Sequence, residues 1–316
     1  MIDPNAQWRH TRFSACWRAG LTYTARDART GNPVGSARFT ITQEISLDPN
    51  STNITENASL LMVAGSASGV VTTMLASWTA SCNSLCSTTD PNPFSNSSPI
   101  AGGETLSGDM AYSNPQTKGV VDSFQTSYML HLVSPGSFLD TPVNYSAPTL
   151  RCDNAVGSSS GCVVPDHIPT LNVDSLEFPV AAAGVRWAQN NLAGHPGLKT
   201  GGTPLRREAV TARQRANRWK VCDASFTKLS TVPSDSCDEF PFAATKQGGS
   251  MNGPDCAEII PSNNGTVTVL KPAGSTTTCM RAHVPLPQNR DVGGDLGQFV
   301  QGQRILDDGP YWVTTD

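Results

Sequence analysis

Nine cysteines restrict most strongly how this 316-residue chain can fold. Six of them lie in segments rich in Gly, Ser, Asn and Asp, as the close pairs Cys82/Cys86, Cys152/Cys162 and Cys222/Cys237. No Cys-x-x-Cys motif occurs and no histidine stands at zinc-finger spacing, which argues against a zinc site. We therefore expect disulfides and a secreted, extracellular protein, with at least one thiol left over. The disulfide candidates are Cys82, Cys86, Cys152, Cys162, Cys222, Cys237, Cys256 and Cys279.

The first 150 residues alternate apolar and polar side chains in the manner of half-buried strands. A charged fraction of 15%, with 27 glycines and 23 prolines, is typical of a loop-rich β protein and excludes a coiled coil or a helical bundle. We predict an antiparallel, β-sandwich-like domain over residues 1–150. Its strands are expected at 21–25, 37–42, 59–63, 69–80 and 126–133.

The pattern changes after residue 150. Residues 151–185 indicate a connector that contains the Cys152/Cys162 loop, and a second domain is expected over 186–316. No apolar run is long enough to span a membrane. The chain is therefore expected to be α+β overall. Beyond residue 175 the expected elements are helices at 178–192 and 204–220, strands at 266–270 and 279–284, and, after a glycine-broken stretch, a short helix at 296–304.

Positive charge is concentrated in one segment, although the net charge of the chain is -4. Residues 186–220 hold eight Lys or Arg against one acid, Glu208. A solvated helix face normally carries compensating acids, so this asymmetry indicates a polyanionic partner. The candidate nucleic-acid-binding residues are Arg206, Arg207, Arg213, Arg215, Arg218 and Lys220.

The sequence around Asp238 and Glu239 is the sharpest local feature. These adjacent carboxylates follow Cys237 and precede Phe240-Pro241-Phe242. Exposed acids in a turn are commonplace, but fixing two carboxylates between a disulfide and an aromatic segment costs conformational entropy. Fixed carboxylates suit metal ligation or general-base catalysis.

A second polar segment begins at Gln288-Asn289-Arg290 and continues into glycines. An Asn carbonyl is a hard oxygen ligand suited to Mg²⁺ or Mn²⁺. An adjacent Arg can offset charge on a phosphate. By itself this segment is also typical of an ordinary loop.

Taken in order, these motifs resemble those of the NucA/NucB deoxyribonucleases, above all the secreted actinobacterial members, which carry an N-terminal β-rich region. The resemblance covers roughly residues 200–316. It implies a small ββα-metal (His-Me-finger-like) nuclease domain, in which an acidic residue replaces the usual histidine, and activity as a metal-dependent, non-specific endodeoxyribonuclease. The motifs are Cys-Asp-Glu-Phe-Pro-Phe-Ala at 237–243, Gln-Gly-Gly at 247–249, Gln-Asn-Arg at 288–290, Gly-Gly at 293–294, Leu-Gly at 296–297 and Arg-Ile-Leu-Asp at 304–307.

The resemblance also implies a role for each motif residue. Asp238 and Asn289 would hold a divalent metal, Mg²⁺ or Mn²⁺. Glu239 is the candidate general base, although the motif leaves open which of Asp238 and Glu239 takes that role. Arg290 would contact the scissile phosphate of a DNA, or RNA, substrate.

One departure from the family pattern keeps other functions open. Simpler bacterial members have Cys-Glu-Glu-Gly-Gly where residues 245–249 here read Thr-Lys-Gln-Gly-Gly. The chain could instead be a non-catalytic nucleic-acid or cell-wall binding protein on a degenerate nuclease scaffold. A third interpretation is a delivered nuclease toxin with an immunity or inhibitor protein as its partner.

His283, which precedes Asn289, either faces the site or is structural.

Overall fold

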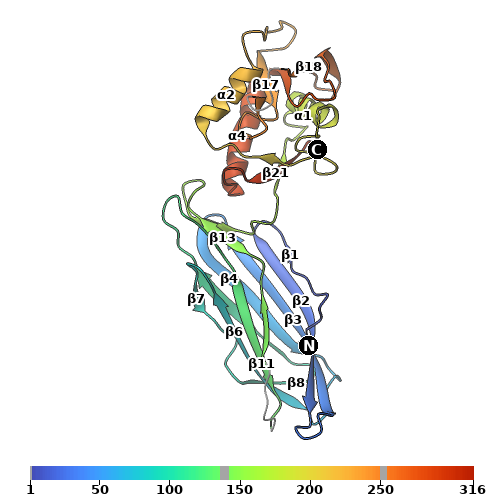
Figure 1. The fold of residues 1–316 in the computed structure, drawn as a ribbon, viewed down its shortest axis with the longest axis vertical. Coiled ribbons are helices and arrows are strands. Elements are labelled where there is room, and N and C mark those ends of the chain that lie inside the picture. Colours follow the sequence, from blue (N-terminus) through green and yellow to red (C-terminus); the bar gives the residue numbers. More distant parts are fainter. Residues whose placement is uncertain (1, 136–141, 250–254) are drawn as a thin grey trace. The chain divides into compact units, whose positions relative to one another are not determined.

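The computed structural model describes residues 2–135, 142–249 and 255–316. The chain divides into two compact units, Met1–His167 and Ile168–Asp316. Sheet predominates, and the three helices that the structure describes lie in the second unit, which confirms an α+β chain with a β-rich N-terminal part (Figure 1). The expected connector, 151–185, contributes to both units, because its first part pairs into an N-terminal sheet and its last part enters a helix of the second unit. None of the described helices is long and apolar enough to cross a membrane.

Two antiparallel sheets make up most of the first unit. One has the strand order β1-β2-β3-β4-β9-β7, with β5 paired to β3, and the other has the order β12-β11-β6-β8. A small third sheet has the order β10-β13-β14. The strands are β1 (Arg9–His10), β2 (Ser14–Arg26), β3 (Pro33–Asp48), β4 (Ser51–Met62), β5 (Ser68–Gly69), β6 (Thr73–Cys82), β7 (Ser87–Asp90), β8 (Ser98–Ala101), β9 (Thr105–Ser113), β10 (Val121–Phe124), β11 (Thr126–Val133), β12 (Val143–Ser146), β13 (Leu150–Asp153) and β14 (Gly161–Val163).

The core of the first unit lies between its sheets. Alternate residues of the long strands are buried, so each sheet has one apolar face. Phe39 and Ile41 of β3 belong to the same hydrophobic cluster as Trp78 of β6 and Leu130 of β11. The period-2 pattern in the sequence therefore predicted both the strands and their packing into a sandwich.

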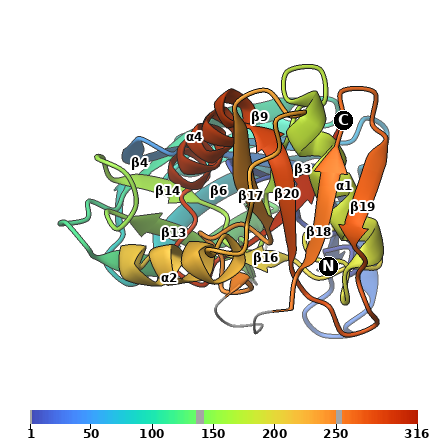
Figure 2. The ribbon, with the colours of Figure 1, turned by 90° about the horizontal axis from the view of Figure 1, so that it is seen from above.

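The second unit is built on a four-stranded sheet with the order β17-β20-β18-β19, in which β17 and β19 are the edges (Figure 2). β17 pairs antiparallel with β20, and β18 runs parallel to β20. A smaller sheet has the order β15-β21-β16. The strands are β15 (Thr170–Asn172), β16 (Leu205–Arg206), β17 (Asp235–Phe240), β18 (Ala257–Pro261), β19 (Val267–Lys271), β20 (Met280–Pro285) and β21 (Pro310–Thr314).

Three helices, α1 (Pro179–Asn191), α2 (Thr211–Val221) and α4 (Leu286–Gly302), surround this sheet. α2 is shorter than the helix expected at 204–220, because Leu205–Arg206 pairs with β21 instead. α4 is longer than the helix expected at 296–304 and runs through the glycine-rich stretch. Burial of Val292 and Leu296 in the core outweighs the roughly 1 kcal/mol that each glycine costs a helix.

All eight candidate cysteines are paired, as Cys82–Cys86, Cys152–Cys162, Cys222–Cys237 and Cys256–Cys279. Cys16, on β2, is the free cysteine. Cys222 caps the C-terminal end of α2, so its bond to Cys237 fastens that helix to β17. This link determines what surrounds the two carboxylates that follow Cys237.

Candidate active site

Asp238 and Glu239 lie near the end of the edge strand β17. Side chains of adjacent strand residues point to opposite faces of a sheet, so the two carboxylates leave β17 on different sides. Both nevertheless line one pocket, together with residues of α2 and α4.

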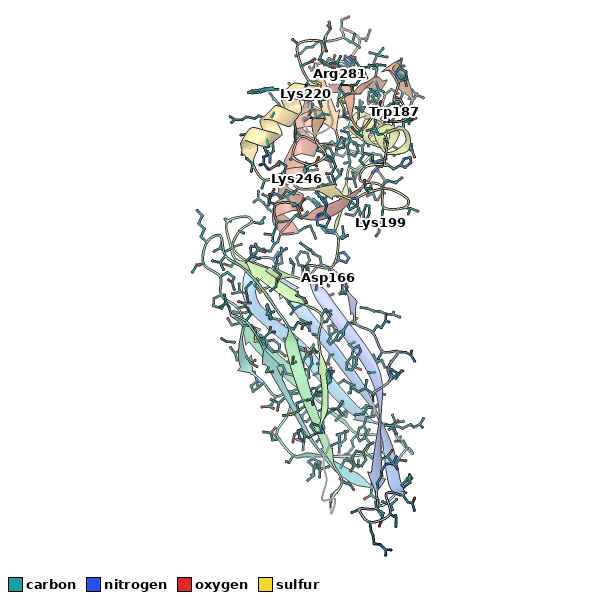
Figure 3. The ribbon with its side chains drawn as sticks, in the orientation of Figure 1. Asp166, Trp187, Lys199, Lys220, Lys246 and Arg281 are labelled. Carbon is teal, nitrogen blue, oxygen red and sulfur yellow. A yellow bond between two sulfur atoms is a disulfide. The ribbon has the colours of Figure 1, made fainter. Side chains whose placement is uncertain are left out.

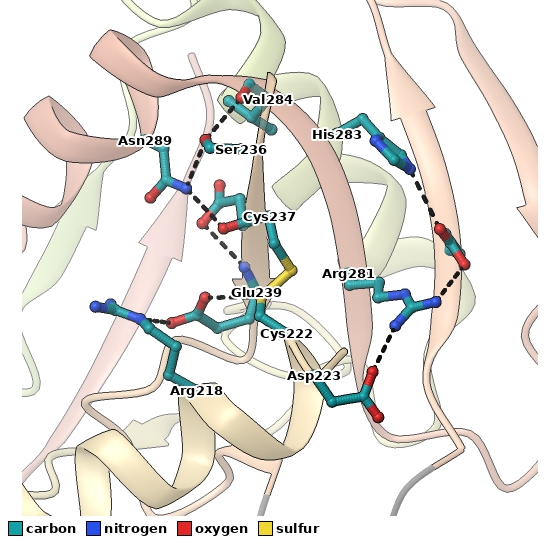
Figure 4. Close-up of a disulfide and its surroundings, with 12 residues drawn as sticks. Arg218, Cys222, Asp223, Ser236, Cys237, Glu239, Arg281, His283, Val284 and Asn289 are labelled. Carbon is teal, nitrogen blue, oxygen red and sulfur yellow. Dashed lines mark hydrogen bonds and ion pairs between the residues drawn. A yellow bond between two sulfur atoms is a disulfide. The ribbon is translucent and has the colours of Figure 1, made fainter. Parts of the chain in front are cut away.

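Glu239 is the more deeply buried of the two, at 5% exposure. Its Oε1 accepts a hydrogen bond from Arg218 Nε on α2 at 3.1 Å (Figure 4). Burial raises the pKa of Glu239, and the charge of Arg218 opposes that rise. The Cys222–Cys237 disulfide holds this pair together, since Cys222 follows the last turn of α2.

Asp238 is half-buried and close to Glu239. Its Oδ1 accepts a hydrogen bond from the Glu239 backbone N–H at 3.0 Å. Burial, and then the negative charge of Glu239, raise the pKa of Asp238 to about 7. A nearby positive charge would therefore be strongly favoured at this carboxylate.

Asn289 reaches β17 from the first turn of α4. Its Nδ2 donates to the carbonyl oxygen of Cys237 at 2.9 Å and to Ser236 Oγ at 3.1 Å. Ser236 Oγ in turn donates to the carbonyl oxygen of Val284. These bonds fix the orientation of the amide, which leaves Oδ1 as its available oxygen (Figure 4).

The pocket has a volume of about 330 Å³. The catalytic candidates Asp238 and Glu239 and the metal candidate Asn289 all line it. Arg207 and Arg218, predicted as nucleic-acid contacts, line it too. Apolar residues of α4, such as Val292 and Leu296, complete one wall.

Glu208 is a third carboxylate of the pocket that sequence reasoning missed. Burial opposes its ionisation, but the Val210 N–H and the Lys246 ammonium together hold its pKa below the ordinary value. Lys246 also contacts Asp307. Glu208 is the one acid in the basic segment 186–220, and this isolation could have marked it as a site residue from the sequence.

The remaining basic residues differ in what they contact. Arg206 bonds Asp308, and Arg213 lies 3.5 Å from Glu208. Arg215 and Lys220 are exposed on α2, and within residues 2–135, 142–249 and 255–316 no carboxylate lies within ion-pair distance of either (Figure 3 labels Lys220). These two cations are the ones most available to an external anion.

Arg290 and His283 do not line the pocket. Arg290 is exposed on α4, one residue beyond Asn289. His283 is buried, with Nδ1 2.7 Å from Asp235 Oδ2 and Nε2 3.2 Å from Glu258 Oε1. Its ring stacks on Phe226. The structural interpretation of His283 is therefore the one that its contacts favour.

The segment that departs from the family pattern also lies outside the pocket. Lys246 bridges Glu208 and Asp307, and Gln247 Oε1 accepts a hydrogen bond from the Arg206 backbone N–H. The two glycines that follow pack tightly against α2. A Cβ on Gly248 would lie 2.2 Å from Asn217 Nδ2. This segment therefore positions α2 and the base of the pocket.

The oxygen atoms at β17 form a sparse ligand set. Within the described part of the chain, no group of three or more His, Cys, Asp or Glu side chains is arranged to hold a metal ion. Asp238, Glu239 and Asn289 all line the pocket, so it offers two carboxylates and one amide oxygen. Mg²⁺ is usually held by one or two carboxylates, with waters and substrate phosphates completing its coordination, so this set fits such an ion better than a structural zinc.

Comparison with known proteins gives one positive result. None of the curated proteins compared with the chain matches it. The family model described as deoxyribonuclease NucA/NucB matches residues 187–314, a range that contains every residue of the pocket. Residues 187–314 of the second unit therefore match the NucA/NucB deoxyribonuclease family, which supports a nuclease domain that acts on DNA.

Proposed function

We propose that the protein is a secreted, metal-dependent endonuclease that hydrolyses DNA phosphodiester bonds without sequence specificity. The observation that carries this proposal is the convergence of Asp238, Glu239 and Asn289 on one pocket beside the guanidinium of Arg218. Four disulfides and the resemblance to secreted actinobacterial members support secretion.

Asp238 and Asn289 are the residues proposed to hold Mg²⁺ or Mn²⁺. The raised pKa of Asp238 supports this, because burial and the neighbouring Glu239 disfavour its ionised form, which a bound cation would stabilise. The chemistry supplied by such an ion is polarisation of the scissile phosphate and stabilisation of the leaving oxygen. The short helix-to-strand bonds of Asn289 would keep its carbonyl oxygen in place during that chemistry.

Glu239 is the proposed general base. Its buried carboxylate would take a proton from the attacking water while a new P–O bond forms and the bond to the leaving oxygen breaks. The leaving oxygen would then take a proton from solvent. Arg218 is 64% exposed along its side chain, so it can hold Glu239 through Nε and still face a phosphate. We propose that Arg218 offsets negative charge at the scissile phosphate. Arg290 would contact the DNA outside the pocket.

Substrate binding is proposed to follow the basic side of α2. Arg215 and Lys220 have no carboxylate partner among the described residues, so they would contact phosphates rather than protein. Such contacts carry no sequence information and weaken as salt concentration rises. A non-catalytic binding protein is less favoured, because the residues that depart from the family pattern, 245–249, do not line the pocket.

The test is degradation of supercoiled plasmid with Mg²⁺ or Mn²⁺, in the presence and absence of EDTA, with an RNA of equal length assayed in parallel. Glu239→Gln keeps the shape of the side chain but cannot accept a proton, so it should lower the cleavage rate at least 100-fold, the order attributed to general bases. Glu177→Ala, which removes an exposed carboxylate of the same unit, should leave the rate unchanged. Cleavage that resists EDTA, or that is equal in wild type and Glu239→Gln, would refute the proposal.

A further inference from the structure

Trp219 is a large aromatic side chain that the second unit leaves exposed. It lies on α2 and is 71% exposed, second only to Leu176 among the large hydrophobic residues described as exposed. A single exposed hydrophobic residue is ordinary by itself. What distinguishes Trp219 is its place between two cations of α2 that have no carboxylate partner among the described residues: Arg215 precedes it by four residues and Lys220 directly follows it.

The charge of α2 is entirely positive. Its eleven residues include Arg213, Arg215, Arg218 and Lys220 and no acid. Arg215 precedes Trp219 by four residues, so the two side chains lie on the same face of the helix, one turn apart. A flat aromatic ring beside a guanidinium with no protein anion is the combination found where single nucleic-acid strands bind.

A second hollow connects this face to the pocket. It has a volume of about 210 Å³ and shares Gln214, Arg218, Ala243 and Ala244 with the pocket. Arg215 lines its far part. A strand whose phosphates follow Arg218 and Arg215 would therefore pass along the helix that bears Trp219.

The disulfide fixes how far Trp219 is from the carboxylates. Cys222 follows Trp219 by three residues, about 4.5 Å along the helix axis, and is bonded to Cys237, which precedes Asp238. Trp219 thus lies one helical turn from Cys222, which ties α2 to the strand that carries Asp238 and Glu239.

We propose that Trp219 stacks on an unpaired base of the substrate strand, so that the domain prefers single-stranded or locally unpaired DNA. The inference rests on the proposed function, because it assigns the substrate form at that same site. Base faces inside a duplex are covered by neighbouring base pairs, so an indole can stack only on a base that is unpaired or terminal. Arg215 and Lys220 would hold the backbone on either side of that contact.

Binding measurements in EDTA test the stacking separately from cleavage. The probes are a short single-stranded oligodeoxynucleotide, a blunt duplex of the same length, and an abasic oligonucleotide with the same number of phosphates. With the full chain, Trp219→Ala should weaken binding of the single strand on the order of tenfold. Binding of the duplex and of the abasic strand should change less than about twofold, since the abasic strand offers no base face and the blunt duplex offers one only at each end. Trp219→Phe should retain most of the single-strand affinity, because it keeps an aromatic ring.

Leu176→Ala is the matched control, because it removes another exposed apolar side chain of the same unit. It should change no affinity. Equal losses for the intact and abasic strands, or no loss with Trp219→Ala, would overturn the stacking. Wild-type protein that binds the single strand in this way but cleaves no DNA with Mg²⁺ or Mn²⁺ would refute the proposed function and leave the stacking standing.

Discussion

The N-terminal core contains a buried carboxyl group whose titration should change the stability of the protein. Glu56 has no exposed surface. Its Oε2 accepts hydrogen bonds from the Tyr112 and Tyr128 hydroxyls, at 2.8 and 2.9 Å, and its Oε1 accepts one from Gln43 Nε2 at 2.6 Å. Burial nevertheless dominates and raises the pKa of Glu56 from 4.5 to about 7.

The size and sign of the effect follow from this difference in pKa. Between pH 4.5 and about 7 the folded chain keeps a proton on Glu56 that the unfolded chain has released. Stability therefore falls as pH rises through this window, and it is constant with respect to this group below 4.5 and above about 7. At 1.36 kcal/mol for each pH unit, the total loss is about 3 kcal/mol.

Urea unfolding at several pH values between 4 and about 8 measures this loss. Glu56→Gln cannot ionise, so the free energy of unfolding of wild type minus that of the variant should fall by about 3 kcal/mol across the window. Taking this difference removes contributions from the second unit, which both proteins share. Glu44→Gln, at an exposed position of β3, should give a difference that varies by only a few tenths of a kcal/mol. A flat difference for Glu56→Gln would refute the reasoning.

Three further outcomes are expected in the nuclease domain. Replacing Cys222 and Cys237 by serine should destabilise the second unit by about 3 kcal/mol, given the 15-residue separation, and should lower plasmid cleavage because α2 loses its link to β17. Gly248→Ala should destabilise the domain by about 1–3 kcal/mol, measured by urea unfolding, because its Cβ would meet the side chain of Asn217. Lys220→Gln should reduce by about 1 the slope of log binding constant against log salt, measured with duplex DNA in EDTA.

Each of these changes has a matched control. Serine at Cys82 and Cys86 opens only a four-residue separation in the other unit and should leave cleavage unchanged. Gly294→Ala, where a Cβ meets nothing within 4 Å, should stabilise α4 by up to about 1 kcal/mol. Lys118→Gln, on the first unit, should leave the salt slope unchanged. If a control variant shows the same loss as the variant it is matched with, that loss is not specific to the proposed site.

Strands and disulfides that depend on a local sequence pattern were predicted from the sequence. Alternation at 37–42 and 126–133 predicted strands of the sandwich, and the close spacing of six cysteines predicted the pairs Cys82/Cys86, Cys152/Cys162 and Cys222/Cys237. Features that depend on tertiary packing were not predicted. The glycines at 293–294 argued against a helix, but burial of neighbouring apolar residues is decided by tertiary packing and outweighs their local preference.

The site was predicted only in part, because some of its residues meet only through tertiary packing. The adjacent carboxylates Asp238 and Glu239 were recognisable as a motif, and the structure brings Asn289 to the same pocket. The Arg218–Glu239 pair was not predicted, because the two residues are distant in sequence and meet only through folding of α2 against β17. Arg290, by contrast, adjoins a site residue in sequence but lies on another side of the helix.

The edge position of β17 has a consequence for how such a domain can change. One face of the strand is bonded to α4 through Asn289, and the other is covered by α2 through Arg218 and the Cys222–Cys237 bond. The proposed ion-holding residue Asn289 and the proposed strand-binding residues Arg215 and Trp219 thus lie on separate helices, α4 and α2, which meet at the pocket. Replacing the exposed residues of α2, with Arg218, Cys222 and the buried Asn217 and Val221 kept, should therefore be a practical route to nucleases of altered substrate preference and unaltered chemistry.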